Sequence, residues 1–240
     1  MRFSKLLAAT LFFAACTDVS STNIRTGGMT AHIHVTAVGN GTTNAAATLT
    51  VGSSLTDFVE LQSSDSLKAT VGSNTQVMTE SKLLNAISYA TSFTGQDAAG
   101  TQYTVALTRG ASDTSAPSST CTLPQPFTIT APAASGTNFS RGTQDITVTY
   151  SGSGQPEPLS WTASGDCIQA ASGSISADTG SFIITKGTLH ALGTADGGSA
   201  ESCQVTVNVT RDRSGTLDPA YGGGSTLCSQ ARSFVVTSAP

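Results

Sequence analysis

His32 and His34 are the residues whose type and spacing come nearest to metal chemistry in this chain. They alternate with the apolar Ile33 and Val35, which is the two-residue period of a β-strand. On a strand both imidazoles point to one face, with Cβ atoms about 6–7 Å apart, and away from the core. A metal site also needs a third ligand, and the sequence names none. We therefore expect solvent-facing histidines, and a ligand- or metal-binding module using this pair is the alternative.

Catalytic chemistry has less support in the sequence. His190 as a general base would need a nucleophile and an orienting acid, and the chain has neither a G-x-S-x-G elbow nor an S-x-x-K motif. The carboxylates are dispersed and form no pair of the kind that glycosidases use. We expect no enzyme activity and no cofactor.

The loop LDPAYGGGST at 217–226 combines a turn, an aromatic ring and three glycines. It lacks the Gly-Lys-Ser/Thr ending of a phosphate-binding loop. Tyr221, Asp218 and the nearby Arg211 are therefore candidates for contact with a ligand or partner. More often, an aromatic residue such as Tyr221 folds back onto its own domain, and an arginine such as Arg211 is a solvated charge at a strand end.

Four cysteines follow in the second half of the chain, apart from Cys16, and predict two disulfides in an exported protein. They have no C-x-x-C spacing of a zinc site. Three pairings exist, and we favour the nested one, Cys167–Cys203 with Cys121–Cys228. Cys121 and Cys228 each precede a predicted strand, at opposite ends of the same predicted domain.

Residues 1–15 have the pattern of a secretory signal peptide. Arg2 and Lys5 precede an uncharged apolar run, Leu6 to Ala15, which is too short for a bilayer span of roughly 20 residues. Small residues then precede Cys16, and the chain turns polar directly after it.

Phe13-Ala14-Ala15-Cys16 resembles the lipobox of bacterial lipoproteins, with Phe13 in place of the usual Leu. The resemblance covers residues 1–16. It implies that the Cys16 thiol receives a diacylglycerol and that Cys16 becomes the N-terminus after cleavage. Thr17, rather than Asp, directly after the cysteine favours the outer membrane, facing the periplasm or the cell surface. An ordinary signal peptide cut near Ala15 is the alternative.

The rest of the chain predicts an all-β fold. Apolar residues recur with period two in short stretches separated by turn signals, as in Val205, Val207 and Val209, which favours antiparallel sandwiches. The predicted organisation is a signal peptide (1–15), a tether (16–28), a first β-sandwich domain (29–110), a linker (111–120) and a disulfide-containing second β-sandwich domain (121–240).

Trp161, shortly before Cys167, resembles the tryptophan packed on the disulfide of immunoglobulin domains, although there the tryptophan follows the first cysteine. The whole chain looks like tandem immunoglobulin-like lipoproteins of bacteria that have no assigned function. That resemblance carries no functional residues. It implies a non-catalytic binding, adhesion or structural role.

Composition excludes one class of partner. Charged residues make up 11% of the chain, and removal of residues 1–15 leaves 9 Lys and Arg against 15 Asp and Glu. Nucleic-acid binding requires clustered Lys and Arg, which are absent from the sequence. The expected partners are a membrane, through the lipid anchor, and a protein or a glycan.

Overall fold

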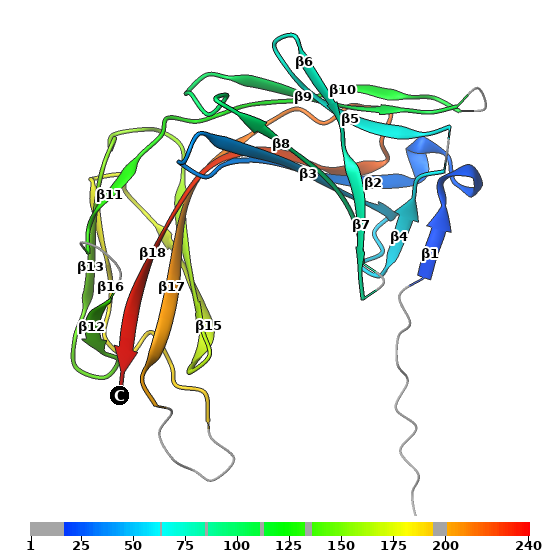
Figure 1. Cartoon of the computed structure of the whole chain (residues 1–240). Coiled ribbons are helices and arrows are strands. Elements are labelled where there is room, and N and C mark those ends of the chain that lie inside the picture. The colour runs from blue at the N-terminus through cyan, green and yellow to red at the C-terminus, as the bar shows by residue number, and fades with distance from the viewer. Residues whose placement is uncertain (1–16, 63, 85, 111–112, 133–135, 194–200) are drawn as a thin grey trace, which may run out of the picture.

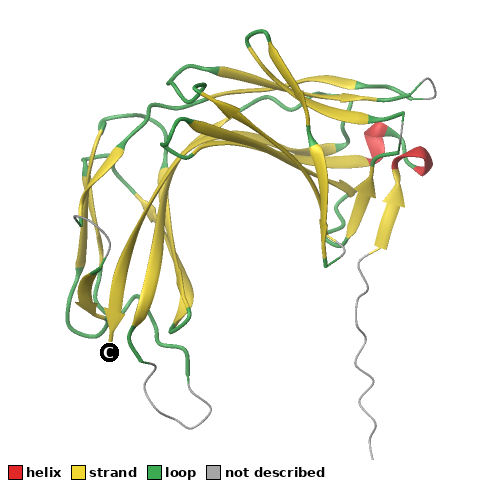
Figure 2. Cartoon of the chain, in the orientation of Figure 1, coloured by secondary structure: helices red, strands yellow, loops and turns green. Residues whose placement is uncertain are grey.

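The computed structural model describes residues 17–240 except 63, 85, 111–112, 133–135 and 194–200. This part of the chain is all-β, with two 3-10 turns, η1 (Ser21–Asn23) and η2 (Thr26–Gly28) (Figures 1 and 2). None of its helices is long and apolar enough to cross a membrane. Its strands are β1 (Thr17–Ser20), β2 (Met29–Ala37), β3 (Thr42–Val51), β4 (Asp57–Glu60), β5 (Ser66–Val71), β6 (Asn74–Val77), β7 (Thr79–Leu83), β8 (Ala86–Thr94), β9 (Gln102–Thr108), β10 (Ala116–Thr122), β11 (Thr128–Ala131), β12 (Thr137–Ser140), β13 (Ile146–Ser151), β14 (Leu159–Gly165), β15 (Ile168–Ile175), β16 (Ser181–Ile184), β17 (Cys203–Ser214) and β18 (Gly223–Ala239).

The first sandwich forms where the sheet β10-β9-β5-β6 covers part of a larger, eleven-stranded sheet. Strand β2 shows how the two-residue period builds its core, because Ile33 and Val35 are fully buried while His32 and His34 are exposed. Phe93 of β8 and Tyr103 of β9 meet edge to face in this core, with ring centroids 5.6 Å apart.

The second sandwich forms where the sheet β11-β13-β16 packs over β14, β17 and the second half of β18. The three valines of β17, at 205, 207 and 209, are fully buried here. Trp161 of β14 pairs with Gly173 of β15, and a Cβ at Gly173 would lie 2.7 Å from the indole nitrogen. A glycine at this position therefore makes room for the tryptophan ring.

One sheet runs through both sandwiches because β17 and β18 reach from one core to the other. Strand β18 pairs in parallel with β2 over Gly223–Gln230, and antiparallel with β17 over 227–238. Its even-numbered residues face the cores, so that Cys228 is buried in the first core and Val236 in the second. The molecule is an arch, with the smaller sheets outside and the uncovered face of the large sheet inside (Figure 1).

The segment 17–28, expected to be a tether, is part of the first sandwich. It forms β1, η1 and η2, and Ser21 and Thr26 are buried. The Arg109 guanidinium donates hydrogen bonds to the backbone carbonyls of Ser21 (2.6 Å) and Ile24 (3.0 Å). Hydrogen bonds therefore fix a polar segment that has few apolar residues to bury.

The linker and the second domain also differ from expectation. Residues 116–120 of the expected linker belong to β10, which pairs with β9 of the first sandwich. Cys121, Leu123, Tyr221 and Cys228 lie in the first core, although the expected second domain began at residue 121. The boundary fails because the β17–β18 hairpin serves both cores, so that no single point in the sequence separates them.

The four cysteines form two disulfides in the nested arrangement. Cys121 of β10 is bonded to Cys228 of β18, with Cα atoms 5.5 Å apart, and Cys167 is bonded to Cys203, with Cα atoms 5.7 Å apart. Cys121–Cys228 lies in the first sandwich, to which the sequence assigned no cysteine. Bridges that close loops of this length stabilise the fold by about 3–5 kcal/mol, largely by restricting the unfolded chain.

Candidate functional site

The candidate functional site is the concave face, which we define as the outward-facing residues of β2, β3, β8, β14, β15, β17 and β18 (Figure 1). Within the described residues, the charged members of these strands are Arg211, Asp212, Arg213 and Arg232. The three arginines occupy core-side positions of the alternation, which leaves Asp212 as the one charged side chain of the face. The Ser229 hydroxyl donates a 2.6 Å hydrogen bond to its carboxylate.

The remaining side chains of the concave face are mostly small and polar, and include hydroxyl, amide and imidazole groups. Examples from both sandwiches are His32, His34, Asn44, Thr48, Thr206 and Asn208. Each of these side chains both donates and accepts hydrogen bonds. The face is therefore chemically suited to a neutral partner with many polar groups.

A shallow groove on this face lies between β14 and β15. Ser160 pairs with Ser174 and Thr162 with Ser172, so four hydroxyl groups flank the groove. Adjacent strands are about 4.8 Å apart and alternate residues along a strand are about 6.6–6.8 Å apart, which sets the spacing of the four groups. This spacing allows one polar partner to contact several hydroxyls at once.

His32 and His34 are on the concave face, as their alternation with buried residues predicts. The Nδ1 atom of His32 lies 3.2 Å from the Ser225 hydroxyl of the adjacent β18. The neighbours of His34 in the sheet are Leu227 and Ala46, which offer no metal ligand. Throughout the described part of the chain, no three His, Cys, Asp or Glu side chains are grouped to hold a metal ion. The metal-binding alternative thus has no third ligand here.

Tyr221, a candidate contact residue in the sequence, is buried in the first core. Burial raises the pKa of its phenol far above the usual range, and its hydroxyl has no hydrogen-bond partner among the described residues. The glycines after it permit close backbone approach to β2. A Cβ at Gly222 would lie 2.2 Å from the Gly27 carbonyl oxygen, and one at Gly224 1.9 Å from that of Ala31. The loop is a packed start of β18 rather than an exposed contact.

Asp218 and Arg211 are also buried, which corrects their assignment as contact residues. Burial alone would raise the pKa of Asp218, but hydrogen bonds from Ser118 and the Ala220 amide outweigh it and lower the pKa. Arg211 forms an ion pair with Asp178 at 2.9 Å and lies over the Phe127 ring. Asp218 and Arg211 therefore both stabilise contacts between loops.

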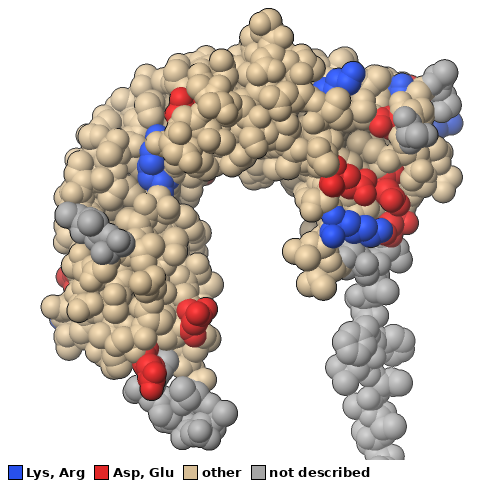
Figure 3. Space-filling view, viewed as in Figure 1, with Lys and Arg blue, Asp and Glu red and all other residues tan. Residues whose placement is uncertain are grey.

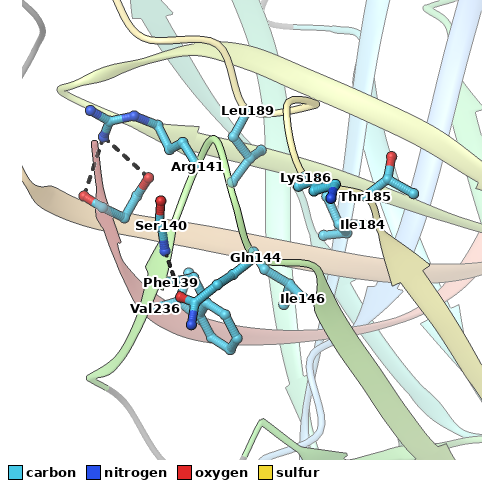
Figure 4. A pocket seen from close by; sticks show the side chains of 11 residues that line it. Phe139, Ser140, Arg141, Gln144, Ile146, Ile184, Thr185, Lys186, Leu189 and Val236 are labelled. Atoms are coloured by element: carbon cyan, nitrogen blue, oxygen red, sulfur yellow. Dashed lines mark hydrogen bonds between the residues drawn. The ribbon is translucent and has the colours of Figure 1, made fainter.

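A small, partly open cavity lies in the second sandwich, lined by Phe139, Ile146, Ile184 and Leu189 among others (Figure 4). Its interior volume of about 10 Å³ is enough for roughly one water molecule. Arg141 donates hydrogen bonds to the carbonyl (3.2 Å) and hydroxyl (3.3 Å) of Ser238. This cavity is too small to hold a ligand larger than a water molecule.

Sequence reasoning missed two groups of residues. Arg109, which fixes residues 21–26, follows a strand directly and carries no signal of its role in the sequence. Three exposed leucines, Leu55, Leu83 and Leu84, were also missed, although Leu-Leu in a polar surrounding at 81–86 is an available signal. The predicted lipidation site, Cys16, lies outside the described residues.

No protein-family model matches this chain, and no curated protein sequence matches it. Among solved structures, it is similar to the crystal structure of the chicken CNTN1 FN1-FN3 domains, with 12% identity and a TM-score of 0.26, over 87% of this chain and 65% of that chain. It is also similar to CBD12 from CALX1.2, with 12% identity and a TM-score of 0.24, over 79% of this chain and 82% of that chain. Scores this low carry no argument about function, and the β-sandwich architecture stands on the sheets themselves.

Proposed function

We propose that this protein is an exported, lipid-anchored component of a bacterial cell envelope that acts by non-catalytic binding through its concave face. The observation that carries the proposal is one sheet spanning both sandwiches, whose concave face, as defined above by seven of its strands, presents mostly polar groups and one charged side chain, Asp212. Hydroxyl and amide groups recognise neutral polar partners by hydrogen bonding. A glycan or a polar protein surface fits this chemistry.

The construction of the arch supports a binding or scaffolding role. The ladder between β17 and β18 runs without a break from Cys203↔Ser238 to Ser214↔Leu227. Because this ladder crosses from one sandwich to the other, the two parts of the concave face are held in one arrangement. A surface that is already ordered loses little conformational entropy when it binds.

The anchor depends on Cys16, which directly precedes Thr17, the first residue of β1. An acyl group there would hold the first sandwich at the lipid surface with almost no intervening chain. A single acyl chain binds membranes only marginally, whereas the two or three chains of a lipoprotein bind persistently. This agrees with a stationary envelope role.

Intact-mass measurement of the protein from its native host tests the anchor. We expect a chain that starts at Cys16 and carries a diacylglycerol, and we expect Cys16→Ser to lose the lipid mass and the membrane association. A wild-type chain that retains residues 1–15, or lacks the lipid, would overturn the anchor.

Site-specific photocrosslinking in the host tests the concave face. A photoreactive residue at Thr162 or Asn208 should give cross-linked products, and one at Thr147, exposed on β13 outside the arch, should not. For a glycan partner, Thr162→Arg with Asn208→Arg should reduce cosedimentation with peptidoglycan sacculi, and Thr147→Arg should leave it unchanged. Equal cross-linking and equal cosedimentation for changes at all three positions would exclude the concave face as the binding site.

A further inference from the structure

One end of the first sandwich gathers the start of β1 and two turns. Thr17 of β1 lies opposite Asp57 of the parallel β4, so both strands start at this end (Figure 1). The β7–β8 hairpin turns there as well, because Lys82 near its tip forms an ion pair with Asp18 of β1. The proposed anchor residue, Cys16, directly precedes Thr17.

Three leucines are exposed at this end, and we call them the leucine end. Leu55 is 87% exposed, two residues before Asp57, while Leu83 and Leu84, 72% and 89% exposed, form the tip of the β7–β8 hairpin. They are the most exposed large apolar side chains in the described part of the chain. None of them packs against the first core.

The backbone at the hairpin tip makes the exposure of Leu84 more notable. Leu84 has φ +48°, the left-handed region that favours glycine and asparagine and that a leucine enters at a cost. Among described non-glycine residues it alone has a positive φ. The chain thus holds a leucine in an unfavourable conformation at a position where its side chain meets solvent. Such strain persists at functional sites when the side chain has a use.

We propose that the leucine end is a second membrane contact, in which Leu55, Leu83 and Leu84 enter the interface of the leaflet that holds the acyl chains of Cys16. This inference rests on the proposed lipid anchor, which brings the leucine end to the lipid surface. Apolar side chains at such a surface add to the affinity of an acyl anchor and fix an orientation.

Charge around the leucine end indicates which lipids it tolerates. Asp18, Glu60 and Glu80 surround Lys82, and charged side chains gather at this end of the arch (Figure 3). Lys82 donates a hydrogen bond to Asp18, and this bond raises the pKa of Lys82. The net negative charge here gives no attraction to anionic lipids. Zwitterionic lipids are therefore the expected surface.

The test uses the acylated full-length protein, with its lipid verified by mass, reconstituted into phosphatidylethanolamine–phosphatidylcholine vesicles. A benzophenone side chain at position 84 should cross-link to phospholipid at least about fivefold more than one at position 77. Val77, which is exposed on β6 away from the leucine end, is the matched control. Replacing a third of the lipid with phosphatidylglycerol should not increase the cross-linking.

A second measurement follows transfer of the acylated protein between vesicles. Leu83→Ser with Leu84→Ser should speed transfer by about tenfold, and Val77→Ser should not change it. Equal cross-linking from positions 84 and 77, with unchanged transfer, would refute membrane contact by the leucine end. That result would leave the proposed lipid anchor intact. A protein that carries no lipid mass would instead refute the proposed anchor, so the two failures are distinguishable.

Discussion

The two sandwiches of this protein are assembled from the chain in different ways. The first combines its N-terminal half with residues 214–230 from near the C-terminus, and its disulfide joins cysteines 107 residues apart. The second uses a nearly continuous stretch, and its disulfide joins cysteines 36 residues apart. The difference shows that the first sandwich depends on contacts between residues far apart in the sequence, whereas the second is formed mostly by residues closer in the sequence.

The buried arginines show the same contrast. Arg109 of the first sandwich pairs with Asp65 at 3.0 Å and Asp113 at 3.5 Å, and fixes the N-terminal segment. Arg211 of the second pairs with Asp178 and donates hydrogen bonds to the carbonyls of Gln125 and Gly152, both at 2.9 Å. One arginine holds a distant segment, and the other holds three loops of its own sandwich.

Removal of each disulfide should give the largest effect and should differ between the sandwiches. Cys121→Ala with Cys228→Ala should lower the free energy of unfolding by about 4–5 kcal/mol, and Cys167→Ala with Cys203→Ala by about 3–4 kcal/mol, because the longer loop loses more closure entropy. Urea unfolding, followed by the fluorescence of Trp161 and by circular dichroism, measures both. Equal losses would contradict the role of loop length.

Replacing a buried arginine should be almost as costly. Arg211→Met should lower the free energy of unfolding by about 3–5 kcal/mol, because Asp178 is then buried without its cation. Adding Asp178→Asn should recover at least about 1 kcal/mol, since the uncompensated charge is removed. Thermal and urea unfolding of the single and double variants check this, and a double variant no more stable than Arg211→Met would refute the charge explanation.

Arg109→Met should open one segment of the first sandwich locally, whereas Arg211→Met should not open that segment. Without the guanidinium, the carbonyls of Ser21 and Ile24 lose their hydrogen bonds from Arg109, and the segment that contains Arg25 should open. Limited trypsin digestion should then cut after Arg25 many times faster than in the wild type. Arg211→Met is the control, and faster cutting at Arg25 in that variant too would indicate global rather than local unfolding.

Acid should weaken the first sandwich through Asp65. Burial alone would raise the pKa of Asp65, but hydrogen bonds from Ser21 and Gly110 and the charge of Arg109 outweigh it and hold the pKa below its ordinary value of 3.8. A carboxyl with a lowered folded pKa stabilises the fold above its unfolded pKa, and this stability is lost as the pH falls through the folded pKa. The free energy of unfolding should fall between about pH 5 and about pH 2.

Asp65→Asn should make that fall shallower, and Asp166→Asn, an exposed acid in the β14–β15 turn, should not. Urea midpoints at a series of pH values give the slopes. Identical slopes for the wild type and Asp65→Asn would show that other acids carry the pH dependence.

The smallest effect is expected at the leucine end. Leu84→Asn should raise the free energy of unfolding by about 0.5–1 kcal/mol, because asparagine tolerates the left-handed region better than leucine. Differential scanning calorimetry can detect the corresponding rise in Tm. A decrease would mean that Leu84 stabilises the fold, against the view that it is retained for contact with lipid.

Much of the strand pattern could be predicted from the sequence, but the segments that connect the two sandwiches could not. Regular alternation of apolar and polar residues identified β2 and β17. Strand β18 was only partly recognisable, because Gln230 and Arg232 occupy core-side positions between the two cores. They donate hydrogen bonds to the carbonyls of Asp97 and Ala37, so polar residues fill positions where apolar ones were expected.

The candidate site was less predictable than the fold. The outward direction of His32 and His34 followed from their neighbours. Tyr221 is buried, as its folding-back interpretation expected, but in the first core rather than in the expected second domain. Its three following glycines suggest a flexible loop in the sequence, whereas here they allow close backbone approach. The concave face has no sequence motif, since it consists of ordinary hydroxyl residues that only the shared sheet brings together.

The continuous β18 has a mechanical consequence. In tandem domains joined by a linker, a pull between the domains is taken up by the linker. Here tension between an anchored first sandwich and a partner on the second would run along β17 and β18, and the hydrogen bonds between the strands would bear it together in shear rather than one after another. Under the proposed anchoring, the arch would transmit force without lengthening.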